Sequence, residues 1–249
     1  MRLWKAWIVT QKDLSVIRKN RYVFYSLIAM PLILGVILPT VFVFALNAEA
    51  SVLAHDQFVA ASNQLINTSS AYLILIGAIL PSIIASYSFV GEKVEKSLEP
   101  LLATPTTDSE LLLGKSLASF VPCLGVTYLS AAVSASIIDV WSYSRFGTFL
   151  VPNFFWVLAV FVFTPLACVL SVEANVIISS RVNDIRAAQQ LGGIVVLPII
   201  GLLLLVVAGA EISPLLALLI SGILVVVVVT LFYISKETFQ REEILTKWK

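Results

Sequence analysis

The sequence GEKVEKSLEPLLATPTTDSELLLGK, residues 91–115, interrupts two long apolar runs and thereby divides the chain. It contains five acidic residues and three lysines, and is therefore too polar to lie in the hydrocarbon of a bilayer. Val94 and Leu98 nevertheless have helical spacing. Glu92 precedes Lys96 by four residues, the favourable order for an ion pair on a helix. We therefore predict an amphipathic helix outside the membrane, held between two membrane spans.

Two signals predict where this helix ends and where the next one starts. Pro100 has no amide hydrogen, so it should break the helix or open a second short one. Thr107 and Glu110 have the spacing of a capping box, in which each side chain bonds the other residue's backbone N–H. The next membrane helix should therefore start at this point. A broken amphipathic element between two spans favours a docking surface for a soluble partner.

The same residues resemble the cytoplasmic loop of ABC-2 type transporter permeases. In that family the pattern GE-[KR]-x-x-[GKS]-[ST]-L-E-x-L-L-A-[ST]-P precedes a Gly-Lys at the start of the third span. The matching residues are Gly91, Glu92, Lys93, Ser97, Leu98, Glu99, Leu101, Leu102, Ala103, Thr104, Pro105, Gly114 and Lys115. The resemblance implies that 91–111 is the coupling region, including the coupling helix that meets an ATP-binding subunit. Lys96 and Ser97 depart from the glycine-threonine of many members, which leaves the partner's identity open.

The resemblance also implies site residues and partners. The residues expected to dock the ATP-binding subunit are Gly91, Glu92, Lys93, Val94, Glu95, Leu98, Glu99, Leu101, Leu102, Thr104 and Pro105. Their carboxylates would face basic residues of the partner, and their apolar side chains would fill its cleft. ATP and magnesium would be bound by that partner rather than by this chain. A second copy of the chain, or a homologous permease, would complete the substrate path.

The composition is that of a polytopic membrane protein. Of 249 residues, 59% are apolar and only 12% are charged, and the mean hydropathy is +0.98. A soluble domain of this length needs more charge on its surface. Six apolar segments each approach the ~20 residues that a helix needs to cross a bilayer. They lie near 22–46, 71–90, 112–138, 153–178, 191–208 and 215–234. We predict an all-α protein with six transmembrane helices in a single domain, 1–249.

Residues 1–21 are predicted to form an amphipathic helix in the headgroup region of the bilayer. One face carries Leu3, Trp4, Trp7, Ile8, Leu14 and Ile17, and six lysines and arginines occupy the rest. Tryptophans and basic residues in this arrangement anchor a helix at the interface. The helix is either a generic anchor or the connecting helix that, in the ABC-2 family, also touches the ATPase.

Basic residues are distributed unequally between the two sets of connections. Fifteen of the sixteen lie in 1–21, in 91–115, in 179–190 or after Ile234. The opposite set, which comprises 47–70, 139–152 and 209–214, holds only Arg145. The positive-inside rule therefore predicts that both termini and the coupling region are cytoplasmic, in the plasma membrane. The external connections should be short, with room for one short helix in 47–70.

Some features of the spans allow two interpretations. Glu173 lies within a span, where a charge costs about 2.5–3.5 kcal/mol, and it is either structural or lines the path. Prolines in five spans are either ordinary packing features or hinges; they are Pro31, Pro39, Pro81, Pro122, Pro165 and Pro198. The run 179–193 resembles the family's second inner loop. In it, Ala187, Ala188 and Gly192 would let neighbouring helices approach closely.

Patterns that are missing from the sequence narrow the function. There is no G-x-x-x-x-G-K-[ST], H-E-x-x-H or G-x-S-x-G sequence, so we expect no enzyme activity and no cofactor in this chain. Cys123, Cys168 and the single histidine, His55, indicate no metal site. Membrane topology explains the basic residues better than nucleic-acid binding does.

Two functional classes follow. The first is the membrane subunit of an ATP-driven exporter. The alternative is an ATP-independent six-helix transporter, channel or membrane assembly factor, which predicts polar residues scattered through several spans. The spans consist mainly of Leu, Ile, Val, Ala and Phe, which favours the first class and an apolar cargo or a path between subunits.

Overall fold

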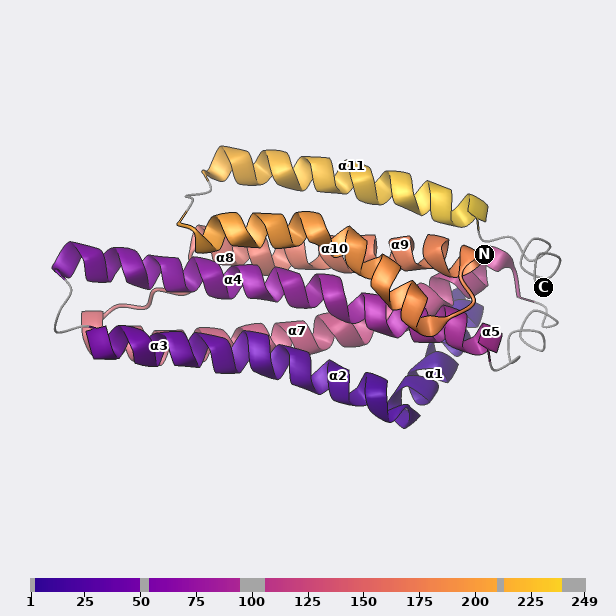
Figure 1. Ribbon diagram of the computed structural model, residues 1–249, viewed down its shortest axis with the longest axis horizontal. Helices are drawn as coiled ribbons and strands as arrows, with labels where there is room; N and C mark the ends of the chain where they lie inside the picture. The colour runs from indigo at the N-terminus through magenta and orange to yellow at the C-terminus, as the bar shows by residue number, and fades with distance from the viewer. Residues whose placement is uncertain (1–2, 50–53, 95–105, 210–212, 239–249) are drawn as a thin grey trace.

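The computed structural model describes residues 3–49, 54–94, 106–209 and 213–238. Within these ranges every regular element is helical. Six helices are long and apolar enough to cross a membrane: Arg21–Glu49, His55–Val94, Asp108–Phe146, Phe154–Arg181, Ile185–Val207 and Pro214–Thr238. They lie side by side in an elongated bundle (Figure 1). The prediction of an all-helical protein with six apolar spans is confirmed.

Several of these long helices consist of shorter elements in sequence. After α1 (Leu3–Lys19), the first comprises α2 (Arg21–Leu32), the π-helical turn η1 (Ile33–Ile37) and α3 (Leu38–Glu49). The second comprises α4 (His55–Ser86), η2 (Tyr87–Gly91) and α5 (Glu92–Val94). The third is the single helix α7 (Asp108–Phe146). The fourth comprises α8 (Phe154–Leu158), η3 (Ala159–Phe163) and α9 (Thr164–Arg181). The last two are α10 (Ile185–Val207) and α11 (Pro214–Thr238).

Helix α4 forms the centre of the bundle. Most of its apolar length is buried, whereas α11 is almost entirely exposed. Helix α4 packs against α7, α9 and α10. Small residues allow this contact with α9: a side-chain carbon at Gly77 would lie 2.8 Å from Thr164 Cγ2, and Ser171 Oγ donates to Ala78 O at 2.6 Å. Close helix contacts of this kind are the usual way in which membrane helices associate.

Two of the π-helical turns occur just before a proline. A proline ring clashes with the carbonyl four residues earlier in an α-helix. For Pro39 and Pro165 that carbonyl belongs to Gly35 and Phe161, which lie inside η1 and η3. The wider π-helical turn gives the ring room without ending the helix. The hinge interpretation of these prolines stays a prediction.

The helices extend further than the predicted spans. Residues from His55 onward belong to α4, so the prediction that 47–70 is a connection with one short helix is wrong. Tertiary contacts explain the difference, because polar side chains in this half of α4 bond to neighbouring helices. Gln64 Nε2 donates to Val206 O and, at 3.2 Å, to Val207 O at the end of α10.

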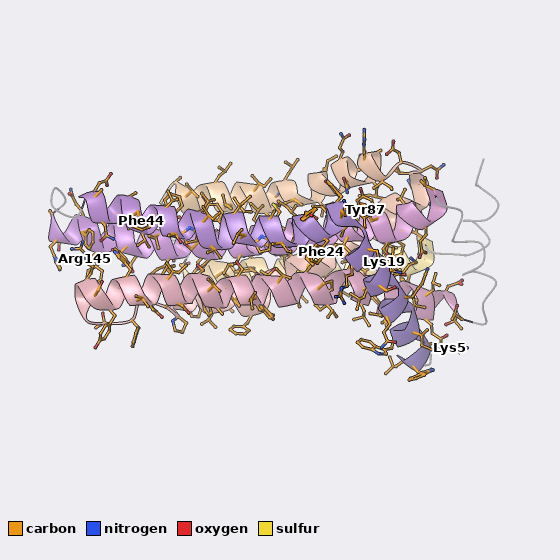
Figure 2. The ribbon with its side chains drawn as sticks, turned by 90° about the horizontal axis from the view of Figure 1, so that it is seen from below. Lys5, Lys19, Phe24, Phe44, Tyr87 and Arg145 are labelled. Carbon is orange, nitrogen blue, oxygen red and sulfur yellow. The ribbon has the colours of Figure 1, made fainter. Side chains whose placement is uncertain are left out.

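Helix α1 lies at one end of the bundle, steeply inclined to the long helices, with Lys5 far from the bundle axis (Figure 2). One face packs on the bundle through Ala6, Val9, Thr10, Asp13 and Ile17. Most of the predicted apolar face is exposed instead, namely Leu3, Trp4, Trp7 and Ile8, while Ile17 is buried. A helix with one packed face and one exposed apolar face suits a bilayer interface, and its position there stays a prediction.

The two ends of the bundle hold different elements. Helix α5 and the end of α11 lie at the same end as α1 (Figure 1). Arg145 lies at the opposite end (Figure 2), where its Nη2 donates to Asn47 Oδ1 at 2.8 Å. Trp141 Nε1 donates to the same oxygen at 2.9 Å, which joins α7 to α3 at this end.

Candidate functional site

The start of α7 is built as the sequence predicts. Thr107 is the N-cap residue, and its Oγ1 accepts from the Glu110 N–H at 3.3 Å. Glu110 Oε2 accepts in return from the Thr107 N–H at 3.1 Å. This capping box confirms the predicted helix start. It places Gly114 and Lys115 in the second turn of α7, beside α1 and the end of η2.

Lys115 is completely buried and its ammonium group is fully surrounded by partners. Its Nζ lies 2.7 Å from Glu92 Oε2, 3.1 Å from Asp13 Oδ2 and 2.7 Å from Ser88 O. The Nζ donates hydrogen bonds to Asp13 Oδ2, Ser88 O and, at 3.3 Å, Ser88 Oγ, while its contact with Glu92 Oε2 is an ion pair. The Nζ also lies 5.4 Å from the centre of the Phe89 ring, which adds a cation–π contact.

The oxygens around Lys115 are themselves held by further contacts. Ser88 Oγ donates to Asp13 Oδ2 at 2.6 Å. Lys12 Nζ pairs with Glu92 Oε1 and lies 3.7 Å from Asp13 Oδ1. Two lysines therefore face two carboxylates. We call the buried residues Asp13, Ser88, Glu92 and Lys115, together with Lys12, whose side chain is 40% exposed, the buried charge cluster.

Close backbone packing brings α1 to this cluster. A side-chain carbon at Gly114 would lie 2.7 Å from both Ala6 O and Val9 Cβ, so only glycine fits at this position. Thr10 Oγ1 donates to Gly114 O at 2.9 Å and is fully buried. The Gly-Lys pair thus has two roles: the glycine admits α1, and the lysine pairs with its Asp13.

The buried charge cluster joins three segments that are distant in sequence: α1, the η2–α5 end of the second span, and the start of α7. Removing one member of a buried ion pair leaves an uncompensated charge, which typically costs about 3–5 kcal/mol. The cluster therefore resists separation of these segments. Because both Glu92 and Lys115 belong to it, the cluster joins the described residues that precede and follow 95–105.

A second set of contacts extends this connection to α9 and α10. Lys93 Nζ donates to Ser179 O near the end of α9. Asn175 Nδ2 donates to Ser82 Oγ at 2.9 Å, and Ser86 Oγ donates to Asn175 Oδ1 at 2.9 Å. At Gly192 of α10 an added side-chain carbon would lie 2.3 Å from Ser82 Oγ. The predicted close approach at Gly192 is confirmed.

The predicted docking residues divide into two groups. Gly91, Glu92 and Lys93 are buried, while Val94 is 56% exposed. Glu95, Leu98, Glu99, Leu101, Leu102, Thr104 and Pro105 lie outside the described residues, as do Lys96 and the helix break expected at Pro100. The carboxylate of Glu92, expected to face a partner, is paired with Lys12 and Lys115 of this chain.

Sequence reasoning missed three members of the cluster: Lys12, Asp13 and Ser88. A signal was present, because Asp13 is the only acid in 1–21 and Lys115 lies within an apolar run. A lysine within an apolar run usually pairs with an opposite charge, and the lone acid of the basic helix is a candidate for that partner. Their pairing could not be assigned, since the two residues are 102 positions apart.

Glu173 belongs to a different environment at the same end of the bundle. It is only 4% exposed, and its Oε2 accepts from Ser235 Oγ of α11. Glu173 lines a cavity of about 350 Å³ between α7, α9 and α11. The cavity wall is formed by Ser109, Leu112, Leu113, Ser116, Leu117, Phe120, Val169, Val172, Glu173, Phe232 and Lys236. In the described part of the chain, no group of three or more metal-ligating side chains is present.

Comparison with known protein families places most of the chain in one of them. Residues 7–213, most of the chain, match the family described as ABC-2 family transporter protein. This range includes α1 from Trp7 onward and the whole buried charge cluster. It also includes every cavity residue on α7 and α9, whereas Phe232 and Lys236 of α11 lie beyond it. No curated protein matches the chain.

Proposed function

This chain belongs to the ABC-2 family of transporter proteins, and we propose that it is the membrane subunit of an ATP-driven exporter. Membrane components of this family have no catalytic activity themselves and generally pair with ATP-binding subunits. In our proposal a separate ATP-binding subunit docks on residues 91–111, binds ATP and magnesium, and drives the substrate path formed by this chain.

The observation that carries the proposal is the buried charge cluster. A partner can transmit force through a segment only if the segment is held firmly to the helices that must move. Glu92, which precedes 95–105, pairs with Lys115, which follows it, and Lys115 also pairs with Asp13 of α1. A push on this segment would therefore be passed to α1, α4 and α7 together. Motion of packed helices as rigid units is a common form of conformational switching.

In this proposal the docking residues have two roles. Glu92 and Lys93 position the coupling region, since their charged groups bond within the chain. Val94 contacts the partner because its side chain is exposed next to the cluster. The residues from Glu95 to Pro105 supply the remaining carboxylates and apolar side chains for docking.

The proposed topology places both termini and the coupling region in the cytoplasm, with the chain in the plasma membrane. The excess of basic residues in 1–21, 91–115, 179–190 and the tail supports this orientation. The position of α1, α5 and the end of α11 at one end of the bundle agrees with it (Figure 1). A second copy or a homologous permease would complete the path, with α1 at the inner surface of the bilayer.

Site-specific photo-cross-linking tests the docking surface. A photo-reactive amino acid replaces Val94 in the full-length chain, and Val140, 74% exposed on α7, serves as the matched control. We expect Val94 to cross-link, in the native membrane, to a protein that carries a G-x-x-x-x-G-K-[ST] sequence, and Val140 not to do so. Cross-linking of neither position to such a protein, with both variants inserted normally, would reject the coupling-region assignment and favour an ATP-independent function.

A further inference from the structure

The cavity beside Glu173 lies on the face of α7 opposite the buried charge cluster. Gly114, Lys115 and Ala118 face α1 and the second span, whereas Ser116, Leu117 and the other α7 residues of the cavity point away from them. From Ser109 to Phe120 the cavity extends along α7 for about 16 Å, at 1.5 Å per residue. Such an elongated, apolar space fits a hydrocarbon chain better than a compact polar solute.

Polar groups occur at defined places in this apolar wall. Glu173 is buried in it, and within the described part of the chain its carboxylate accepts a hydrogen bond from the hydroxyl of Ser235 alone. Among the described residues no lysine or arginine nitrogen lies within salt-bridge distance of Glu173. Ser116 Oγ is also buried and has no hydrogen-bond partner in the described part of the chain. A carboxylate can accept about four hydrogen bonds, so acceptor capacity remains at Glu173.

Lys236 lines the cavity as well, but its position differs from that of Glu173. It follows Ser235 on α11, and its side chain is exposed, whereas Glu173 is enclosed. Ser109, in the first turn of α7, lines the cavity at the same end. The order from the bundle end inward is therefore a polar mouth, then Glu173 with Ser235, then apolar residues as far as Phe120.

We propose that this cavity binds an amphipathic cation, with its amine at Glu173 and its hydrocarbon chain along α7 toward Phe120. The negative charge of Glu173 in an apolar wall is complementary to an ammonium group, which would supply the donors that the carboxylate and Ser116 can accept. A cavity of about 350 Å³ is within the ~300–1,000 Å³ typical of small-molecule sites. In the proposed topology the molecule enters from the inner leaflet. That it is cargo rests on the proposed export function; that it binds does not.

Binding of dodecylamine to the full-length chain in lipid nanodiscs tests this inference without an ATP-binding partner. We expect saturable binding that protein-free nanodiscs lack, and at least tenfold weaker binding of dodecanol, which has the same chain and no charge. Glu173→Gln keeps a hydrogen-bond acceptor for Ser235 but removes the charge, and it should weaken dodecylamine binding at least tenfold. Lys236→Gln, which removes the positive charge at the mouth, should tighten dodecylamine binding. Glu49→Gln is the matched control: it removes a carboxylate from the end of α3, outside the cavity, and should leave binding unchanged.

A second variant keeps the test decisive if Glu173→Gln does not fold. Leu117→Trp retains the acid but fills the apolar space, and it should also abolish saturable binding. The inference is overturned if wild-type protein shows no saturable binding of dodecylamine. It is equally overturned if dodecanoate binds more tightly than dodecylamine and depends on Lys236, which would indicate an anionic amphipath. A chain that cross-links through Val94 but binds no dodecylamine would reject this inference and leave the proposed function intact.

Discussion

Two buried charges at the same end of the bundle, Lys115 and Glu173, have opposite surroundings. Lys115 is enclosed by two carboxylates and a backbone carbonyl from its own chain. Glu173 has a serine hydroxyl and an apolar cavity. A buried charge that the chain itself compensates holds segments together, whereas a buried charge without a counter-ion among the described residues is available to a ligand. The comparison separates an anchor from a binding site on opposite faces of α7.

Removing the positive charge of Lys115 should have the largest effect on stability. Lys115→Met keeps a similar shape but removes the positive charge that pairs with both Asp13 and Glu92. We expect a loss of about 3–5 kcal/mol in stability, because an uncompensated charge remains buried. Thermal unfolding of the full-length chain in detergent or nanodiscs measures it as a large fall in Tm.

A second substitution shows whether charge balance is the cause. Lys115→Met combined with Asp13→Asn restores equal numbers of positive and negative charges and should recover part of the lost Tm. If the double variant is instead less stable than Lys115→Met alone, the two substitutions add their costs and the cluster does not act through charge compensation.

The packing of α1 against α7 gives the next largest effect. Gly114→Ala would place a carbon 2.7 Å from Ala6 O, and overpacking of this kind typically costs about 1–3 kcal/mol. Gly125→Ala on the same helix is the control, since nothing lies within 4 Å of the added carbon. There the better helix propensity of alanine should stabilise the protein by about 0.5–1 kcal/mol. Equal Tm values for the two variants would contradict the close contact.

A similar pair on α10 tests its contact with α4. Gly192→Ala would bring a carbon to 2.3 Å from Ser82 Oγ, whose side chain can move, so the expected cost is about 1–2 kcal/mol. At the adjacent Gly193 no atom lies within 4 Å of an added carbon, and Gly193→Ala should not destabilise the protein. Thermal unfolding of both variants measures the difference. Greater harm from Gly193→Ala would mean that α10 presents a different face to α4 and α9.

Neutralising Glu173 should have the smallest effect on stability. Glu173→Gln keeps an oxygen for Ser235 and removes a charge that has no counter-ion among the described residues, so we expect a change below about 1 kcal/mol. Its effect should appear in ligand binding instead. A Tm loss as large as that of Lys115→Met would show that Glu173 is also a structural anchor, and would remove the distinction between the two charges.

Local patterns predicted the elements well but not the contacts between them. The capping box at Thr107 needs only residues three apart, and six apolar segments can be recognised by length and hydropathy alone. In contrast, the first half of α4 was assigned to a connection because its side chains are polar. The polar side chain of Gln64 is accommodated there because it bonds Val206 O of α10. Val206 is 142 positions further along the chain, so no local pattern contains this contact.

The candidate site shows the same division. The Gly-Glu and Gly-Lys pairs at the two ends of 91–115 were recognised from their order in the sequence, and Glu92 was expected to face a partner. Its pairing with Lys115 and with Lys12 of α1 depends on how three helices meet. Glu173 was identified as a charge within a span, but the cavity beside it results from the arrangement of α7, α9 and α11.

The most direct test of the account is affinity purification of the full-length chain in mild detergent, with the stoichiometry of the partners measured. The account predicts an ATP-binding subunit, recognised by its G-x-x-x-x-G-K-[ST] sequence, in an equimolar ratio with this chain. A homo-oligomer without such a subunit, even after trapping with an ATP analogue or vanadate, would contradict it.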